Sequence, residues 1–236
     1  MAGRTPARKL RPRDDAGRGR TKRAGELWPA RRGPAPGRLG EGAAPVKRAV
    51  AEAVAHFLDA LLPVEERHAD GLPGTPERVA EAWIDDLLDG YRRDPVAILA
   101  EAMPSRGKDL VAVTGIDFHS VCPHHLLPSR GVAHVAYVPG GKVAGFGQIA
   151  RLLDCFAHRL VLEEDLARQV AETLVSHLGA RGAACILDAE QACLTMRGER
   201  RRAARAHVQC FVGALDTDAR LQGRFLALVG ARRRKG

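Results

Sequence analysis

Apolar side chains follow two kinds of spacing along the chain. They recur every three or four residues from Val50 to Leu61, which predicts a helix that ends near Pro63. A second helix is expected shortly afterwards, with Thr75 as its N-cap and Pro76 as its first helical residue. The first folded segment is therefore helical.

The alternation typical of strands dominates the middle of the chain. Strand-like runs cover residues 110–113, 116–118, 132–138, 183–187, 192–196 and 206–212. Two helices, residues 148–162 and 163–178, interrupt this series, and residues 219–229 predict a closing helix. Residues 95–108 show no pattern that determines an element. Strands, then two helices, then further strands indicate the α+β class with an antiparallel sheet.

The composition is that of a globular chain of one or two domains. Its 236 residues are 45% hydrophobic, which is enough for a core, and no apolar run reaches the length of a transmembrane helix. The basic N-terminal region is not followed by an apolar run, so no secretory signal is expected. Five scattered cysteines do not suggest a disulfide framework. A cytoplasmic protein without membrane contact is expected.

The positive charge is confined to one end of the chain. Residues 1–48 hold 14 Lys/Arg and 4 Asp/Glu, whereas the remaining residues carry a net charge of −1. Residues 1–48 are therefore expected to be a disordered, basic Gly/Pro/Arg-rich tail, and residues 49–232 the folded domain. The tail is either a solvated leader or a segment attracted non-specifically to nucleic acid or another polyanion.

A short block holds the residue types that bind metals. Cys122 and His125 are separated by two residues and can both reach one Zn²⁺, which favours thiolate and imidazole ligands. In an extended segment neighbouring side chains point to opposite faces, so His124 and His125 should not share the ion, and one stays free for proton transfer. Cys193, on an expected strand, is the candidate third ligand. The alternative is a packed cysteine beside two surface histidines.

Several motifs in order resemble the GTP cyclohydrolase I family, over roughly residues 49–230. The matching segments are residues 75–80, 122–128, 131–139, 149–151, 156–159, 196–198 and 225–226. The resemblance implies a T-fold, an antiparallel four-stranded sheet with two helices packed on one face, plus N-terminal helices, assembled into an oligomeric barrel. It also implies a homo-oligomer, as a decamer, with pockets between subunits.

The resemblance implies a reaction and a set of residues for it. Zn²⁺ would be held by Cys122, His125 and Cys193, and His124 would transfer protons. The family opens the imidazole ring of GTP by attack of metal-activated water at C8. It releases formate and yields 7,8-dihydroneopterin triphosphate, in the first step of pterin and folate biosynthesis. Cys155 and Cys185 lie in apolar patterns and are expected in the core.

Substrate contacts are implied by the same resemblance. Glu164 matches the glutamate that reads guanine, and Glu163 stands at the adjacent position of that pair. Arg151 and Arg197 match contacts to the triphosphate, for which guanidinium groups are suited. Gln148 stands where the family has a phosphate-binding lysine.

The chain departs from the family pattern at other positions. Gln191 replaces a histidine thought to act as acid and base, and an amide cannot titrate. Pro123 replaces a glutamate. Residues 200–205 are rich in arginine, and one hypothesis is that they replace the lost phosphate-binding charge while His207 replaces the lost imidazole.

The departures leave three alternatives to the full reaction. These are another purine nucleotide as substrate, a formylamino-pyrimidine product, and a non-catalytic protein that binds zinc and nucleotide or a partner enzyme.

Overall fold

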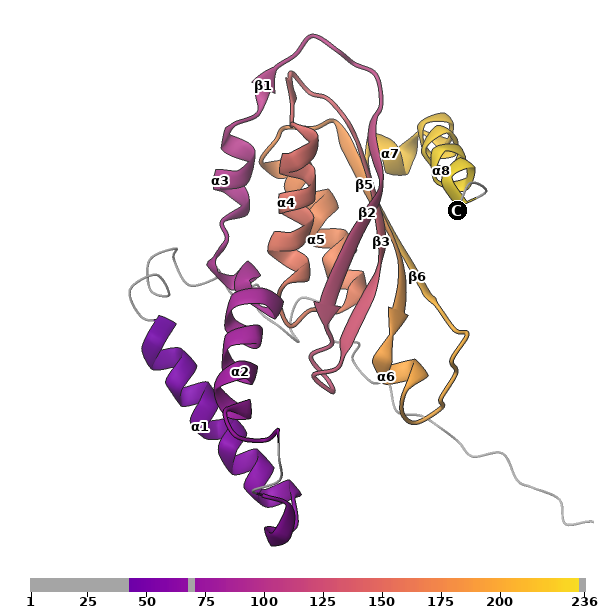
Figure 1. The fold of residues 1–236 in the computed structure, drawn as a ribbon. Coiled ribbons are helices and arrows are strands. Elements are labelled where there is room, and N and C mark those ends of the chain that lie inside the picture. Colours follow the sequence, from indigo (N-terminus) through magenta and orange to yellow (C-terminus); the bar gives the residue numbers. More distant parts are fainter. Residues whose placement is uncertain (1–42, 68–70, 234–236) are drawn as a thin grey trace, which may run out of the picture. The chain divides into compact units, whose positions relative to one another are not determined.

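The computed structural model describes residues 43–67 and 71–233 of the chain (Figure 1). The α-helices are α1 Ala43–Leu61, α2 Thr75–Glu81, α3 Pro95–Ala100, α4 Phe146–Ala157, α5 Glu163–Ser176, α6 Ala192–Thr195, α7 Ala214–Thr217 and α8 Ala219–Arg233. The strands are β1 Met103–Pro104, β2 Val111–Val121, β3 Pro128–Val138, β4 Lys142–Val143, β5 Gly182–Gln191 and β6 Ala206–Gly213. Short 3₁₀ segments cover Val64–Glu66 and Asp89–Arg92, and a π-helix covers Ala82–Leu87.

Four strands form the central sheet, in the order β2-β3-β5-β6, and every neighbouring pair is antiparallel. The two strands expected at residues 110–113 and 116–118 are parts of the single strand β2, which is interrupted by an irregularity between Thr114 and Ile116. Gly115, with φ 78°, takes the extra position. A second, two-stranded sheet pairs β1 with β4.

Helices α4 and α5 cover one face of this sheet, and α8 lies on the other (Figure 1). The first face holds the larger core, in which Leu152, Leu166 and Leu174 are fully buried. Phe225 of α8 is fully buried in the core of the second face. A four-stranded antiparallel sheet with two helices on one face, preceded by α1 and α2, confirms the expected α+β class and T-fold arrangement.

The N-terminal boundary differs from the one expected. Helix α1 begins at Ala43, so residues 43–48, expected in the tail, are helical. Residues 1–42 of that tail lie outside the described part of the chain. The expected N-cap of α2 is also wrong, because Gly74 caps the helix in a left-handed conformation. The Thr75 hydroxyl instead donates to the carbonyl oxygen of Gly71 (3.3 Å).

One predicted strand is wrong. Residues 192–195 form the single helical turn α6, in which Met196 N donates to Ala192 O (2.9 Å). A short apolar run fits a strand and a helical turn equally well, and here no strand pairs with it beyond the end of β5. Cys193 therefore lies on a helical turn, whereas Cys155 and Cys185 are buried as expected. None of the described helices has the length and apolar character that crossing a membrane requires.

Leu174→Ala should lower the free energy of unfolding by about 2–5 kcal/mol, because the side chain is fully buried and its removal leaves a cavity. Urea unfolding followed by circular dichroism measures the change. Leu226→Ala on α8 is the matched control, since Leu226 is 43% exposed and should cost less than about 1 kcal/mol. Equal losses in the two variants would contradict this packing.

Candidate metal centre

Three adjacent strands, β2, β3 and β5, have their termini close together at one end of the sheet. Ser120 of β2 pairs with Ser129 of β3, and Ser129 pairs in turn with Gln191 of β5. These three residues form a row across the sheet. Cys122 follows Ser120 by two residues, and Cys193 follows Gln191 by two residues. The register of the strands therefore brings both cysteines to the same end of the sheet, although 71 positions separate them in the sequence.

Cys122 and His125 lie in the turn that joins β2 to β3. Cys122 N donates to Leu127 O (3.0 Å), and Leu126 N donates to Cys122 O (2.9 Å). Leu126 has a positive φ of 55°, which is uncommon for a residue with a side chain. The segment is therefore a turn and not the extended chain expected. The rings of His124 and His125 meet edge-on, with centroids 6.3 Å apart and an angle of 72° between their planes, and the candidate ligand group includes His125 but not His124.

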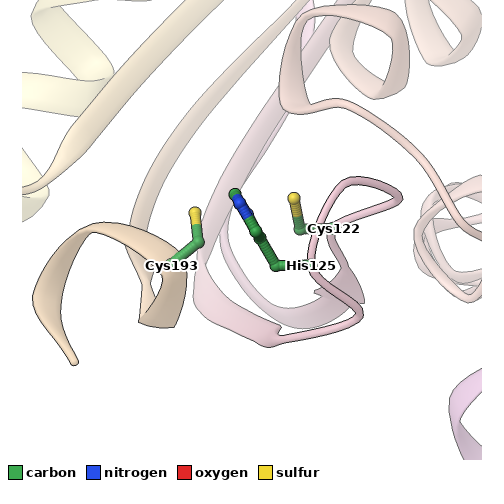
Figure 2. A group of neighbouring side chains, drawn as sticks. All are labelled: Cys122, His125 and Cys193. Carbon is green, nitrogen blue, oxygen red and sulfur yellow. The ribbon is translucent and has the colours of Figure 1, made fainter. Parts of the chain in front are cut away.

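The side chains of Cys122, His125 and Cys193 lie next to one another, with the His125 ring between the two cysteines (Figure 2). Their ligand atoms all lie within 4.8 Å of one another. A tetrahedral metal with bonds of about 2.0–2.3 Å holds its ligand atoms roughly 3.5–4 Å apart, so a small inward movement is enough to close the group on an ion. Two sulfurs and one imidazole nitrogen suit a borderline-soft divalent metal. The three residues fit a metal site with one position left for a further ligand.

A cavity of about 170 Å³ opens beside this group. Its lining includes His124, Glu163, Glu164 and Gln191 together with the three candidate metal ligands. His124 and Glu164 are exposed, whereas Glu163 is only 4% exposed. The structure thus brings seven of the ten site residues expected from the sequence to one cavity.

Glu163 is a buried carboxylate held by two serines. Oε1 of Glu163 accepts hydrogen bonds from the hydroxyls of Ser129 (2.6 Å) and Ser120 (3.1 Å), and the two hydroxyls are themselves 2.6 Å apart. Within the described residues, Oε2 has no hydrogen-bond partner. Burial raises the pKa of the Glu163 carboxyl, and the serine hydrogen bonds oppose that shift. Through these hydrogen bonds, Glu163 links the first turn of α5 to β2 and β3, the two strands joined by the turn that carries Cys122 and His125.

Two polar residues contact the candidate ligands directly. The Sγ of Cys193 donates to Oε1 of Gln191 (3.5 Å). A hydrogen bond of 2.6 Å joins Nη1 of Arg197 to Nε2 of His125. The arginine expected to bind phosphate therefore lies against the three candidate metal ligands, which are called the metal group below. Burial and then the neighbouring Cys122 raise the pKa of the Cys193 thiol.

Gln148 and Arg151 do not line this cavity. Both residues lie in α4. The segment just before α4 is held at the end of β3 that is distant from the candidate ligands, because Ala144 N donates to the hydroxyl of Tyr137 (3.0 Å). Gln148 Oε1 accepts from Gly145 N and its Nε2 donates to Ile98 O, both at 2.7 Å, so the amide caps α4. Arg151 is exposed and pairs with Glu101 (3.6 Å).

The arginine-rich segment is divided between several partners. Arg205 pairs with Asp188, which also lies 3.5 Å from His207, and Arg201 pairs with Glu199. His207 is half exposed and does not line the cavity beside the metal group. Arg200 and Arg202 line a neighbouring cavity of about 480 Å³. The segment does not place a second imidazole beside the metal group.

The sequence interpretation assigned no role to Ser120 and Ser129. Their function depends on pairing across two strands and on a helix that begins more than 30 residues later. The only local signal is that Ser120 stands two positions before Cys122. A prediction of the strand register would have placed these two serines beside the turn that carries two candidate metal ligands.

The model of the family described as GTP cyclohydrolase I matches residues 50–230. A "GTP cyclohydrolase 1" of Chromobacterium violaceum is 46% identical over 155 residues, covering 66% of this chain and 75% of the relative. One from Ralstonia nicotianae is also 46% identical over 155 residues, covering 66% and 74%. A "GTP cyclohydrolase 1 1" of Pseudomonas syringae pv. tomato is 37% identical over 180 residues, covering 75% and 96%.

Among solved structures, the archaeosine synthase QueF-Like in its apo form aligns with a TM-score of 0.38 at 18% identity. The alignment covers 46% of this chain and 97% of that chain. A likeness this distant carries no argument about the site.

Glu163→Gln should stabilise the protein at neutral pH, because burial makes the ionised carboxylate unfavourable. Because the pKa of Glu163 is raised, the folded state keeps a proton that the unfolded state has lost. The free energy of unfolding therefore falls as pH rises from the ordinary glutamate pKa, about 4.3, through the raised one. Glutamine removes this titration and keeps an oxygen for Ser129. Below about pH 4 the variant and the original protein should be equally stable.

Urea unfolding midpoints between pH 4 and pH 8 measure the difference. Glu164→Gln, in the same helical turn but exposed, is the control and should change stability by less than about 0.5 kcal/mol. A Glu163→Gln variant that is less stable than the original protein at pH 8 would show that the carboxylate is preferred in its ionised form.

Proposed function

The chain belongs to the GTP cyclohydrolase I family, and on this premise we propose that it is a zinc-dependent hydrolase acting on GTP. In the proposed reaction the imidazole ring of GTP opens, formate is released, and 7,8-dihydroneopterin triphosphate forms. The observation that carries the proposal is the convergence of Cys122, His125 and Cys193 beside a cavity that His124 also lines.

Zinc is the proposed metal because the donor set of two thiols and one imidazole is typical of its sites. Three protein ligands leave a fourth position open, which distinguishes catalytic from structural zinc. When bound, Zn²⁺ activates water for attack at neutral pH and polarises oxygen atoms of the substrate. Cys122, His125 and Cys193 would hold it.

His124 is the proposed proton-transfer residue. It lines the cavity, is exposed to it, and does not belong to the candidate ligand group. Imidazole is the side chain most often used to accept and return a proton near neutral pH. The turn that holds His125 on the metal side therefore leaves His124 available to the substrate.

Of two adjacent carboxylates, we propose that one binds the guanine base. Glu164 is exposed to the cavity, so its oxygens can accept from the N–H groups of guanine. Glu163 lies behind it, and its serine-bound oxygen is already saturated. We assign base reading to Glu164 and a supporting position to Glu163.

The triphosphate needs charges that one copy does not bring together. Arg197 lies at the metal centre, but Arg151 lies on α4, toward the other end of the sheet. A homo-oligomer, a decamer in the proposed form, would place the α4 end of one copy beside the metal end of its neighbour. Arg151 would then reach the phosphates of a nucleotide bound to the next copy.

Gln191 favours a second candidate outcome at the same site. It lines the cavity and contacts Cys193, but its amide cannot donate and recover a proton as an acid–base group does. A reaction that lacks this group would stop after ring opening and leave a formylamino-pyrimidine. A different purine nucleotide, or zinc and nucleotide binding without turnover, are the remaining alternatives.

We also propose a cytoplasmic location, because all five cysteines are free thiols and reducing compartments keep them so. Contact of the basic tail with polyanions remains a hypothesis that concerns mainly residues outside the described ranges.

Zinc-loaded protein incubated with GTP should release formate and form a fluorescent dihydropterin. His124→Ala should lower the turnover rate by at least about a hundredfold, the usual contribution of general acid–base catalysis, while zinc content stays unchanged. Formate release, pterin fluorescence and metal analysis measure the three quantities. Consumption of GTP without formate release would identify the formylamino-pyrimidine alternative, because that product keeps C8 as its formyl group. No consumption of GTP by the zinc-loaded protein would exclude the proposed enzyme.

Cys193→Ala should lose at least about 90% of the bound zinc after dialysis against a weak chelator, because only two protein ligands remain. Inductively coupled plasma mass spectrometry of the dialysed protein gives the zinc stoichiometry. Cys210→Ala is the control, since Cys210 lies on β6 outside the ligand group and should keep one zinc per chain. Equal zinc content in both variants would show that Cys193 is not a ligand.

A further inference from the structure

A second polar cleft lies at the end of the sheet opposite the metal centre. Residues 105–108, residues 139–141 and Arg181 line it, and its volume is about 650 Å³. The loops that form it follow β1, β3 and α5 (Figure 1). This cleft borders the end of the β2–β3 pair at which Val111 pairs with Tyr137. The turn that carries Cys122 and His125 lies at the opposite end, where Val121 pairs with Pro128.

The cleft concentrates positive charge. Arg106, Lys108 and Arg181 contribute three cations and Ser105 a hydroxyl, and no acidic residue lines it. Asp109 follows Lys108 in the chain but is not part of the lining. Within residues 43–67 and 71–233, none of the three cations has a carboxylate within ion-pair distance among the salt bridges found, unlike Arg130, Arg151 and Arg205 elsewhere.

This concentration does not follow from the overall composition. Residues 49–236 carry 23 basic and 24 acidic side chains, so their charges nearly balance. Three unpaired cations around one cleft in such a sequence repel one another unless a bound anion or counterions offset them. The electrostatics therefore favour an anion in the cleft.

Backbone hydrogen bonds fix the loops that carry these cations. Ser105 N donates to Gly141 O (2.9 Å), and Arg181 N donates to Val138 O (2.8 Å). Gly107 N donates to the hydroxyl of Ser105 (3.1 Å). At Gly140 a side chain is impossible without rearrangement, because a Cβ would come within 1.9 Å of the Gly179 carbonyl oxygen. The cleft is therefore built on anchored backbone, which lowers the ordering cost of binding.

We propose that this cleft binds the phosphate chain of a polyphosphate-bearing small molecule. Guanidinium and ammonium groups form charge-assisted hydrogen bonds with phosphate oxygens, and three cations match a chain with several negative charges better than a single phosphate. A volume of about 650 Å³ exceeds what one phosphate needs. No aromatic side chain lines the cleft, so it offers no surface on which bases of a nucleic acid would stack.

The phosphate chain has two possible sources. It is either the triphosphate of the nucleotide bound at a neighbouring copy's metal centre, which rests on the proposed function, or a separate polyphosphate that binds whether or not the reaction occurs. The anion site itself depends only on the residues of the cleft.

The test uses inorganic tripolyphosphate and the full-length, zinc-loaded protein. Isothermal titration calorimetry should show saturable binding that weakens as salt is raised. Lys108→Ala and Arg181→Ala should each weaken binding about tenfold, as expected for a lost charge-assisted hydrogen bond. Arg224→Ala is the control, because Arg224 is exposed on α8 and does not line the cleft. Any contribution of the basic tail is the same in all four proteins.

Competition then separates the two sources. If saturating GTP displaces tripolyphosphate and the cleft variants raise the KM for GTP, the cleft holds the phosphates of the substrate. If GTP does not compete, it holds a separate anion. Unchanged affinity in both cleft variants, or no binding by the original protein, would overturn the proposal whatever the activity toward GTP. Variant-sensitive tripolyphosphate binding without GTP turnover would instead overturn the proposed function alone.

Discussion

The register of β2, β3 and β5 is the constraint on which the site depends. Ser120, Ser129 and Gln191 pair in one row, and the candidate ligands follow within a few residues of that row. A slip of one residue would turn both serines to the opposite face of the sheet and break their hydrogen bonds to Glu163. Buried strands with one apolar face resist such a slip, so the packing of α4 and α5 indirectly fixes the geometry of the metal group.

Two different groups of polar residues lie at opposite ends of the same sheet. The metal group and the carboxylates lie at one end, whereas Arg151 and the basic cleft lie toward the other. Among the described residues, Arg197 is the cation with a hydrogen bond to a candidate ligand, His125. The residues proposed to act on the base and the basic cleft thus lie at different ends of the same strands.

The sequence predicted what local patterns and motifs encode. Amphipathic spacing located α1, α5 and α8, and the motif around Cys122 identified the family and the three side chains that the fold brings together. Non-local features were out of reach. The pairing of Ser120 with Ser129 depends on register, and the capping role of Gln148 depends on contact with Ile98. Residues 192–195 were mistaken for a strand because four apolar-rich residues carry no periodicity that separates one helical turn from a strand.

The placement of Cys122 and Arg151 toward opposite ends of one sheet has a genetic consequence. If each site joins the metal end of one copy to the α4 end of another, two inactive alleles with damage at different ends would produce some intact sites when expressed together. A cell carrying both would regain part of the activity that neither allele supplies alone. Two alleles damaged at the same end would never complement each other, so crosses between such mutants would map the chain into two groups.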